Sequence, residues 1–102
     1  MKTWGIVRFN VGLKSKPTRD DYSTVGRVLA SFGIDGATIF PAVGIWRGEQ
    51  EHSIVIDVVD IFWDTWTNDK GVKDVADKLR VAFDQDFVLV TEHSITASLV
   101  GD

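Results

Sequence analysis

The sequence predicts an α+β domain whose elements follow the order β-α-β-β-α-β, and three observations lead to this prediction. Apolar and polar residues alternate over residues 4–11 and 53–59, which is the period of a half-buried strand. Residues 18–33 and 69–83 instead repeat their apolar positions every three or four residues, as amphipathic helices do. Between them, Gly36–Asp60 contains two apolar runs joined by a short polar break, which is typical of a β-hairpin.

The first strand is predicted over Trp4–Val11. One of its faces would enter the core through Val7, Phe9 and Val11, and the other would carry Trp4, Ile6, Arg8 and Asn10. The last strand is predicted over Phe87–Val100, with a break near His93 that would divide it in two. The two ends of the chain therefore both supply strands.

The first helix is predicted to begin at Thr18 and to stop at Gly33. The Thr18 hydroxyl suits an N-cap, and Asp21, three residues later, completes a capping box. Gly26 lies inside the helix, where glycine costs about 1 kcal/mol relative to alanine, so we expect it to permit close packing on the sheet. The apolar face consists of Tyr22, Val25, Leu29 and Phe32.

The central hairpin begins with a strand that proline should keep at the edge of the sheet. Pro41 has no backbone N–H to donate to a ladder, so an internal position is disfavoured. Gly44 marks a bulge that lets this strand continue to Trp46, and Gly48–Glu51 form the polar break. The returning strand is predicted to bury Ile54, Ile56 and Val58 and to direct Ser53, Val55, Asp57 and Val59 to the other face.

The second helix is predicted to begin near Asn68 or Asp69, after an irregular aromatic segment at Ile61–Thr67. That segment fits a turn, a short helix or a flap. Asp84–Asp86 would end the helix. Its apolar stripe consists of Val72, Val75, Ala76, Leu79, Ala82 and Phe83.

This order of elements is the ferredoxin-like, or split βαβ, pattern, in which two helices cover one face of an antiparallel sheet. The strand order of that fold, 4-1-3-2, places the second strand at an edge, in agreement with Pro41. Arg8 and Asp57 would then meet on the open face as an ion pair. We expect residues 1–102 to form this single ferredoxin-like α+β domain.

Composition limits the classes of function. The 102 residues are 44% apolar and 25% charged, contain no cysteine and carry a net charge of −4. Disulfides and thiolate sites are therefore excluded, and an acidic chain is a poor general ligand of nucleic acids. Neither a signal peptide nor an apolar run of membrane-spanning length is apparent, so we expect a soluble cytoplasmic protein that does not enter membranes.

Two stretches carry a recognisable pattern. Gly44–Gly48 reads G-I-W-R-G and precedes Glu51, Ser53 and an apolar strand, and Gln85 precedes a V-L-V strand. This arrangement resembles a family of small uncharacterised bacterial and phage proteins with a G-x-W-x-G hairpin. The resemblance implies a ferredoxin-like fold and implies no activity. The chain departs from that family in its basic loop before the first helix and in the aromatic segment Ile61–Trp66.

Catalytic and metal-binding residues are sparse in this chain. His52 and His93 are the only histidines, and neither lies in a recognised catalytic or metal-ligand spacing. We interpret them as ordinary surface or strand-end residues. The sequence therefore predicts no catalytic residue, no metal site and no cofactor.

A basic cluster precedes the first helix and consists of Lys14, Lys16 and Arg19. Exposed N–H groups and the helix dipole favour an anion at such a position, and three cations would strengthen its binding. A phosphate or nucleotide is the natural ligand, although the chain has no glycine-rich phosphate loop. The alternative is a solvated loop whose charges keep the sheet edge soluble.

Tryptophan is unusually frequent, with four in 102 residues. Trp46 lies at the hairpin end, and Trp63 and Trp66 lie in the acidic aromatic segment. One interpretation is a surface that contacts a partner or stacks on bases. The other is that these rings cover the ends of the sheet, since large aromatic residues are mostly buried.

These features favour a non-enzymatic binding protein of the kind that a phage or mobile element uses as an accessory, counter-defence factor. It would capture a host protein or a small anionic nucleotide-type ligand through the basic cluster and the tryptophans, with Arg8 and Asp57 on the open face. The alternatives are a small dimeric α+β-barrel enzyme that uses the open face and a histidine, and a structural or assembly subunit. A half-apolar open face also predicts a homodimer or a higher homo-oligomer.

Overall fold

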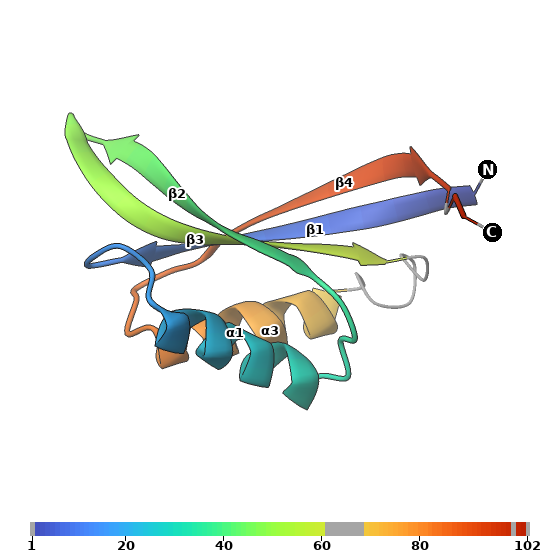
Figure 1. Ribbon diagram of the computed structural model, residues 1–102, viewed down its shortest axis with the longest axis horizontal. Helices are drawn as coiled ribbons and strands as arrows, with labels where there is room; N and C mark the ends of the chain where they lie inside the picture. Colours follow the sequence, from blue (N-terminus) through green and yellow to red (C-terminus); the bar gives the residue numbers. More distant parts are fainter. Residues whose placement is uncertain (1, 61–68, 99, 102) are drawn as a thin grey trace.

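The computed structural model describes residues 2–60, 69–98 and 100–101. Within them, four strands and two helices follow the predicted order β-α-β-β-α-β (Figure 1). Their bounds are β1 Lys2–Leu13, α1 Arg19–Ser31, β2 Thr38–Trp46, β3 Glu49–Asp60, α3 Asp69–Ala82 and β4 Leu89–Ala97. The irregular segment that the sequence placed at Ile61–Thr67 lies outside the described residues.

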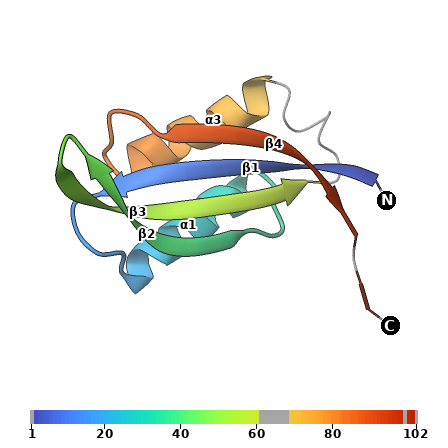
Figure 2. The same ribbon diagram turned by 90° about the horizontal axis from the view of Figure 1, so that it is seen from above.

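The strands form one antiparallel sheet in the order β2-β3-β1-β4, which confirms the ferredoxin-like arrangement. Both helices lie on the same face of the sheet, and the other face is left open (Figures 1 and 2). As Pro41 predicted, β2 is an edge strand; β4 is the other edge. The helix layer supports the middle of the sheet, and the β2–β3 hairpin curls away from it at one end.

The core lies between the sheet and the helices, and the predicted inward faces of the two central strands build its floor. Three cross-strand pairs of β1 and β3 are fully or almost fully buried: Val7 with Val58, Phe9 with Ile56, and Val11 with Ile54. Each such side chain contributes about 1.5–3 kcal/mol through burial. The helices contribute the other side of the core, with Val25, Val28, Leu29, Val72, Val75 and Leu79.

Helix α1 begins and ends as its sequence predicted. Thr18 caps it, and the backbone N–H of Thr18 donates to Asp21 Oδ2 at 2.8 Å while Asp21 N–H donates back to the threonine hydroxyl. Gly33, at φ +72°, ends it with a hydrogen bond from Ile34 N–H to the Leu29 carbonyl at 3.1 Å.

Three expectations for the helix faces are wrong. Gly26 is exposed, and a Cβ at this position would meet nothing within 4 Å, so it does not permit close packing on the sheet. The buried face of α1 includes Val28, whereas Phe32 remains 37% exposed. In α3, Ala82 is exposed, although the rest of the predicted stripe is buried or packs against the core.

The hairpin is more regular than the sequence implied. Its turn is Arg47-Gly48, with φ of +52° and +81°, the left-handed pair that a two-residue hairpin loop uses. Glu49 already belongs to β3, so the predicted break at Gly48–Glu51 is misplaced. The register from Thr38 to Trp46 is continuous, without a bulge at Gly44, and β4 is likewise continuous through His93.

Candidate functional site

The open face of the sheet carries an ion pair at its centre, as the sequence predicted. Arg8 on β1 and Asp57 on β3 are register partners, and the guanidinium donates to both carboxylate oxygens, with Nε to Oδ1 at 2.7 Å and Nη2 to Oδ2 at 2.8 Å. The hydrogen bond to Asp57, followed by its charge, raises the pKa of Arg8 above its ordinary value. The Arg8 guanidinium also lies 5.8 Å from the ring centre of Phe40, within cation–π range.

Apolar side chains flank this pair on both sides along the strands. Towards the hairpin, register places Phe40, Val55, Asn10 and Leu89 in one row across the sheet, which is apolar except for Asn10. Towards the other end, it places Val59, Ile6 and His93 in one row, which is apolar except for His93. Val55 is almost fully buried at 3% exposure, but Val59 and Leu89 remain 46% and 57% exposed. The open face is therefore a polar row between two apolar rows.

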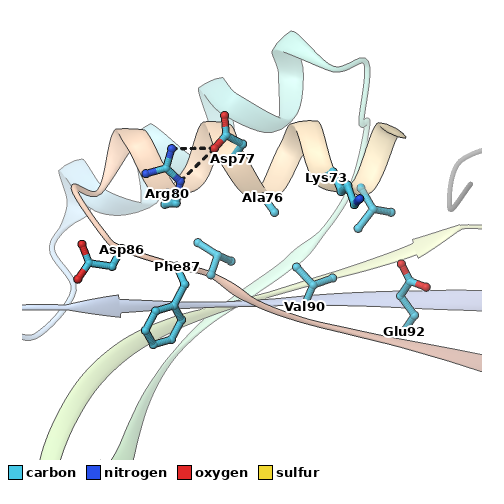
Figure 3. Close-up of a pocket in the computed structure, with 10 residues that line it drawn as sticks. Lys73, Ala76, Asp77, Arg80, Asp86, Phe87, Val90 and Glu92 are labelled. Carbon is cyan, nitrogen blue, oxygen red and sulfur yellow. Dashed lines mark hydrogen bonds and ion pairs between the residues drawn. The ribbon is translucent and has the colours of Figure 1, made fainter. Parts of the chain in front are cut away.

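A second feature is a groove of about 480 Å³ between α3 and the edge strand β4 (Figure 3). It lies on the helix-covered side of the sheet, away from the Arg8–Asp57 pair. Helix α3 and the segment that leads into β4 form its two walls. The residues that line it are Val72, Lys73, Ala76, Asp77, Arg80, Asp86, Phe87, Val88, Val90 and Glu92.

The groove combines both signs of charge with an exposed aromatic ring. Arg80 is engaged within its own helix, since it donates to Asp77 Oδ1 through Nε at 3.0 Å and Nη2 at 2.8 Å. Lys73 on the helix wall and Asp86 and Glu92 on the strand wall are exposed. Phe87, 72% exposed, lies beside Asp86 at one end of the groove with its ring directed away from α3, whereas Lys73 and Glu92 lie towards the other end (Figure 3). The groove therefore offers carboxylates, a cation and an aromatic ring at different places along its length.

The basic cluster remains a prediction. Lys14, Lys16 and Arg19 are all exposed around the loop before α1. Lys14 Nζ lies 4.0 Å from Asp84 Oδ2, a contact that offsets part of its charge. None of the three lines the groove.

The tryptophans divide between the described and undescribed parts of the chain. Trp46 is 63% exposed at the hairpin tip, where the Arg47 guanidinium lies 5.6 Å from its ring. It therefore does not cover the end of the sheet. Trp63 and Trp66 lie outside the described residues.

The two histidines lie on different strands. His52 on β3 is the register partner of Leu13 on β1, and His93 on β4 is the register partner of Ile6 on β1. Both are exposed. Among the residues that the structure describes, no group of three or more histidine, cysteine or carboxylate side chains is placed to hold a metal ion.

The groove was not predicted from the sequence. One signal for it was present: Val88, Val90 and Glu92 follow the two-residue period of a strand, so Glu92 lies on the same side as two apolar residues. A carboxylate on the inward side of an edge strand marks a place where the core opens to solvent. The wall formed by α3 gives no comparable signal in the sequence, because charged residues are common on the solvent-facing side of a helix.

Comparisons with known proteins support the fold. No family model and no curated protein matches the chain. Among solved structures, it is similar to a phage SAM lyase in its apo state, with a TM-score of 0.58 and 23% identity over 95% of this chain and 92% of the other. It is also similar to the divalent ion tolerance protein CutA1 from Ehrlichia chaffeensis, with a TM-score of 0.53 and 17% identity over 97% and 87%.

These similarities establish the shared α+β fold. Membership of the family with a G-x-W-x-G hairpin stays a prediction. In the described part of the chain, neither helix has the length and apolar character needed to cross a bilayer.

Proposed function

We propose that this chain is a small ligand-binding protein of the phage-accessory type and that its ligand is S-adenosylmethionine. The observation that carries the proposal is the mixed chemistry of the groove between α3 and β4, which carboxylates, a lysine and an exposed phenylalanine line along its length. The similarity to a phage SAM lyase, which spans nearly the whole of both chains, supports the choice of ligand and the phage context.

The groove matches this ligand group by group. The positively charged sulfonium is attracted to the Glu92 carboxylate, which lies at the same end of the groove as Lys73 (Figure 3). At the other end of the groove, the exposed ring of Phe87 offers a surface on which adenine can stack. Lys73 supplies a cation for the carboxylate of the methionine portion.

Lyase chemistry is the second candidate, and the similarity to the phage SAM lyase favours it. In such a reaction, a carboxylate oxygen of the ligand's own methionine portion attacks the carbon bonded to sulfur. A carbon–oxygen bond forms, the carbon–sulfur bond breaks, and the electron pair leaves with sulfur as a neutral thioether, so a lactone and a thioether are released. Such a reaction depends more on how the ligand is held than on a protein nucleophile. It therefore suits a groove that contains charged and aromatic side chains and neither serine nor histidine.

Calorimetric titration with S-adenosylmethionine tests the binding proposal. Glu92→Gln removes the charge from the strand wall, and loss of a charged hydrogen bond costs about 1.5–3 kcal/mol, or roughly 10- to 150-fold in Kd. The matched control is Asp74→Asn, an exposed carboxylate on α3 that does not line the groove, and it should bind as the wild type does. Absence of binding, or equal losses in both variants, contradicts the proposal.

A neutral ligand separates sulfonium recognition from adenosine recognition. S-adenosylhomocysteine lacks the positive sulfur and should bind the wild type more weakly than S-adenosylmethionine does. In Glu92→Gln, the two Kd values should lie closer together. Mass spectrometry of the same mixtures reports whether the sulfonium is consumed and a thioether appears. Binding without consumption supports the binding protein; consumption that Glu92→Gln slows supports the lyase.

Calorimetric titration also tests the basic cluster. Titration with ATP tests whether Lys14, Lys16 and Arg19 hold an anionic nucleotide, and a Lys14→Ala/Lys16→Ala/Arg19→Ala variant shows whether these side chains cause any binding. If ATP binds and S-adenosylmethionine does not, the ligand site is the basic loop.

A further inference from the structure

We infer that the open face of the sheet is an interface between copies of this chain, with the open face of a second copy packed against it. This interface is independent of the proposed ligand, because the groove lies on the helix-covered side of the sheet. Three features of the open face carry the inference: its apolar rows, the arrangement of its charges and its size.

The apolar rows leave large side chains in contact with water. Val59 and Leu89 are 46% and 57% exposed, and they lie in different rows on opposite sides of the polar row. Phe40 and Val55 continue one row, in which Asn10 is the polar member, and Ile6 continues the other, in which His93 is the polar member. A second sheet that packs face to face, as in β-sandwiches, would remove both rows from solvent.

The central charges favour an identical partner. Arg8 and Asp57 neutralise each other in a bidentate pair, so the face presents no excess charge to attract an acidic or a basic protein. A two-fold axis parallel to the strands, between β1 and β3, would set β1 of each copy opposite β3 of the other. Arg8 would then face Asp57 of the second copy, and each apolar row would meet its own equivalent.

The size of the face fits a stable interface. Strands β1 and β3 contain 12 residues each, which gives a length of about 40 Å, and four strands span about 19 Å. The face therefore offers on the order of 700 Å², close to the ~800 Å² that each partner contributes to a standard interface. Neither α1 nor α3 lies on this side of the sheet (Figure 1).

Light scattering after size-exclusion chromatography tests the interface. The wild type should elute with a mass of twice 11.3 kDa or a larger multiple. Val59→Lys and Leu89→Lys should each lower the mass to one chain, because both positions are already exposed in a single copy and tolerate lysine without unfolding. Val81→Lys on α3 is the control: it replaces a valine that is 62% exposed outside the open face and should leave the mass unchanged.

A charge exchange tests the orientation of the two copies. Arg8→Asp alone places two carboxylates together within each copy and across the interface, so it should weaken assembly at least tenfold. The double variant R8D/D57R restores opposite charges in both places and should recover assembly. Circular dichroism of each variant confirms that the fold persists.

The result that overturns the inference is a wild-type protein that is one chain at 100 µM, or open-face variants that keep the oligomer. Recovery in R8D/D57R supports the proposed axis, and a failure to recover with a normal circular dichroism spectrum contradicts it. Titration of the single-chain Val59→Lys variant with S-adenosylmethionine keeps this result separate from the proposed function, since the groove is unchanged in that variant.

Discussion

The two faces of the sheet are built from the same strands but differ in what covers them. Along β1, Val7, Phe9 and Val11 are fully buried under the helices, whereas the Arg8 side chain between them is 44% exposed. The covered face is almost purely apolar, and the open face alternates apolar and charged rows. In the described part of the chain, only the apolar surface that faces α1 and α3 is covered by the protein itself.

Val55 is a buried residue on the open face. It lies on the open face yet is only 3% exposed, between Phe40 on β2 and Asn10 on β1 in the register. Neighbouring side chains on both sides are therefore enough to bury a valine. Val59 lies beyond the last β2 pair, Thr38 with Asp57, and Leu89 lies on the edge strand β4, so each lacks a neighbour on one side and stays exposed.

The largest effect should come from the covered face. Phe9→Ala removes a fully buried ring and should lower the free energy of unfolding by about 3–5 kcal/mol. Urea unfolding followed by circular dichroism measures this change. Ile6→Ala, three positions away on the open face, is the matched substitution and should cost less than half as much at concentrations where the protein is a single chain. Equal costs would show that the open face is covered within one chain.

The central pair gives the next largest effect. Asp57→Asn removes the charge that holds Arg8 in a bidentate contact, so the melting temperature should fall, but by less than in Phe9→Ala. R8D/D57R should recover most of the loss because it keeps the pair with its signs reversed. A double variant as unstable as Asp57→Asn would mean that local packing, rather than the pair, stabilises this row.

Helix α1 also has one side that packs against the core and one side that is exposed. Gly26→Ala should stabilise the protein by about 1 kcal/mol, since the position is exposed and a methyl group meets nothing. Thermal unfolding should therefore show a higher midpoint. Gly33→Ala should act in the opposite direction, because φ +72° is strained for alanine. A destabilised Gly26→Ala would place this side of α1 against another surface.

The smallest effect is expected at the hairpin tip, where Ile45 and Trp46 are 76% and 63% exposed. Arg47 occupies a left-handed position that asparagine adopts more easily, and Arg47→Asn creates the Asn-Gly turn that two-residue hairpins prefer. We expect a gain of about 0.5 kcal/mol, measured by chemical unfolding. A loss would indicate that the contact between Arg47 and Trp46 outweighs the turn preference.

Most of the fold was predictable because it depends on local patterns. Alternation fixed the inward faces of β1 and β3, Thr18 with Asp21 predicted the start of α1, and Pro41 predicted the edge. The Arg8–Asp57 pair followed from strand order combined with alternation. The turn was misplaced because arginine, unlike asparagine or glycine, gives no sign of a left-handed conformation.

The groove was not predictable in the same way. Its walls come from α3 and from the start of β4, and they meet only because β4 occupies the edge of the sheet beside that helix. Glu92 was a local sign, but nothing in the sequence indicated that Lys73 would stand opposite it. The sequence likewise does not show which apolar residues of α1 face the core. Val28 and Phe32 are both apolar, and the packing of the helix on the sheet determines that Val28 is the buried one.

Pro41 has a consequence for the behaviour of this protein at high concentration. Open sheet edges can recruit further strands and seed fibrils, and β4 presents such an edge without a proline. Growth by stacking chains edge to edge requires two receptive sides, and Pro41 removes a backbone donor from the other one. The proline thus acts as a terminator of polymer growth, and Pro41→Val should increase the rate at which thioflavin-positive aggregates form.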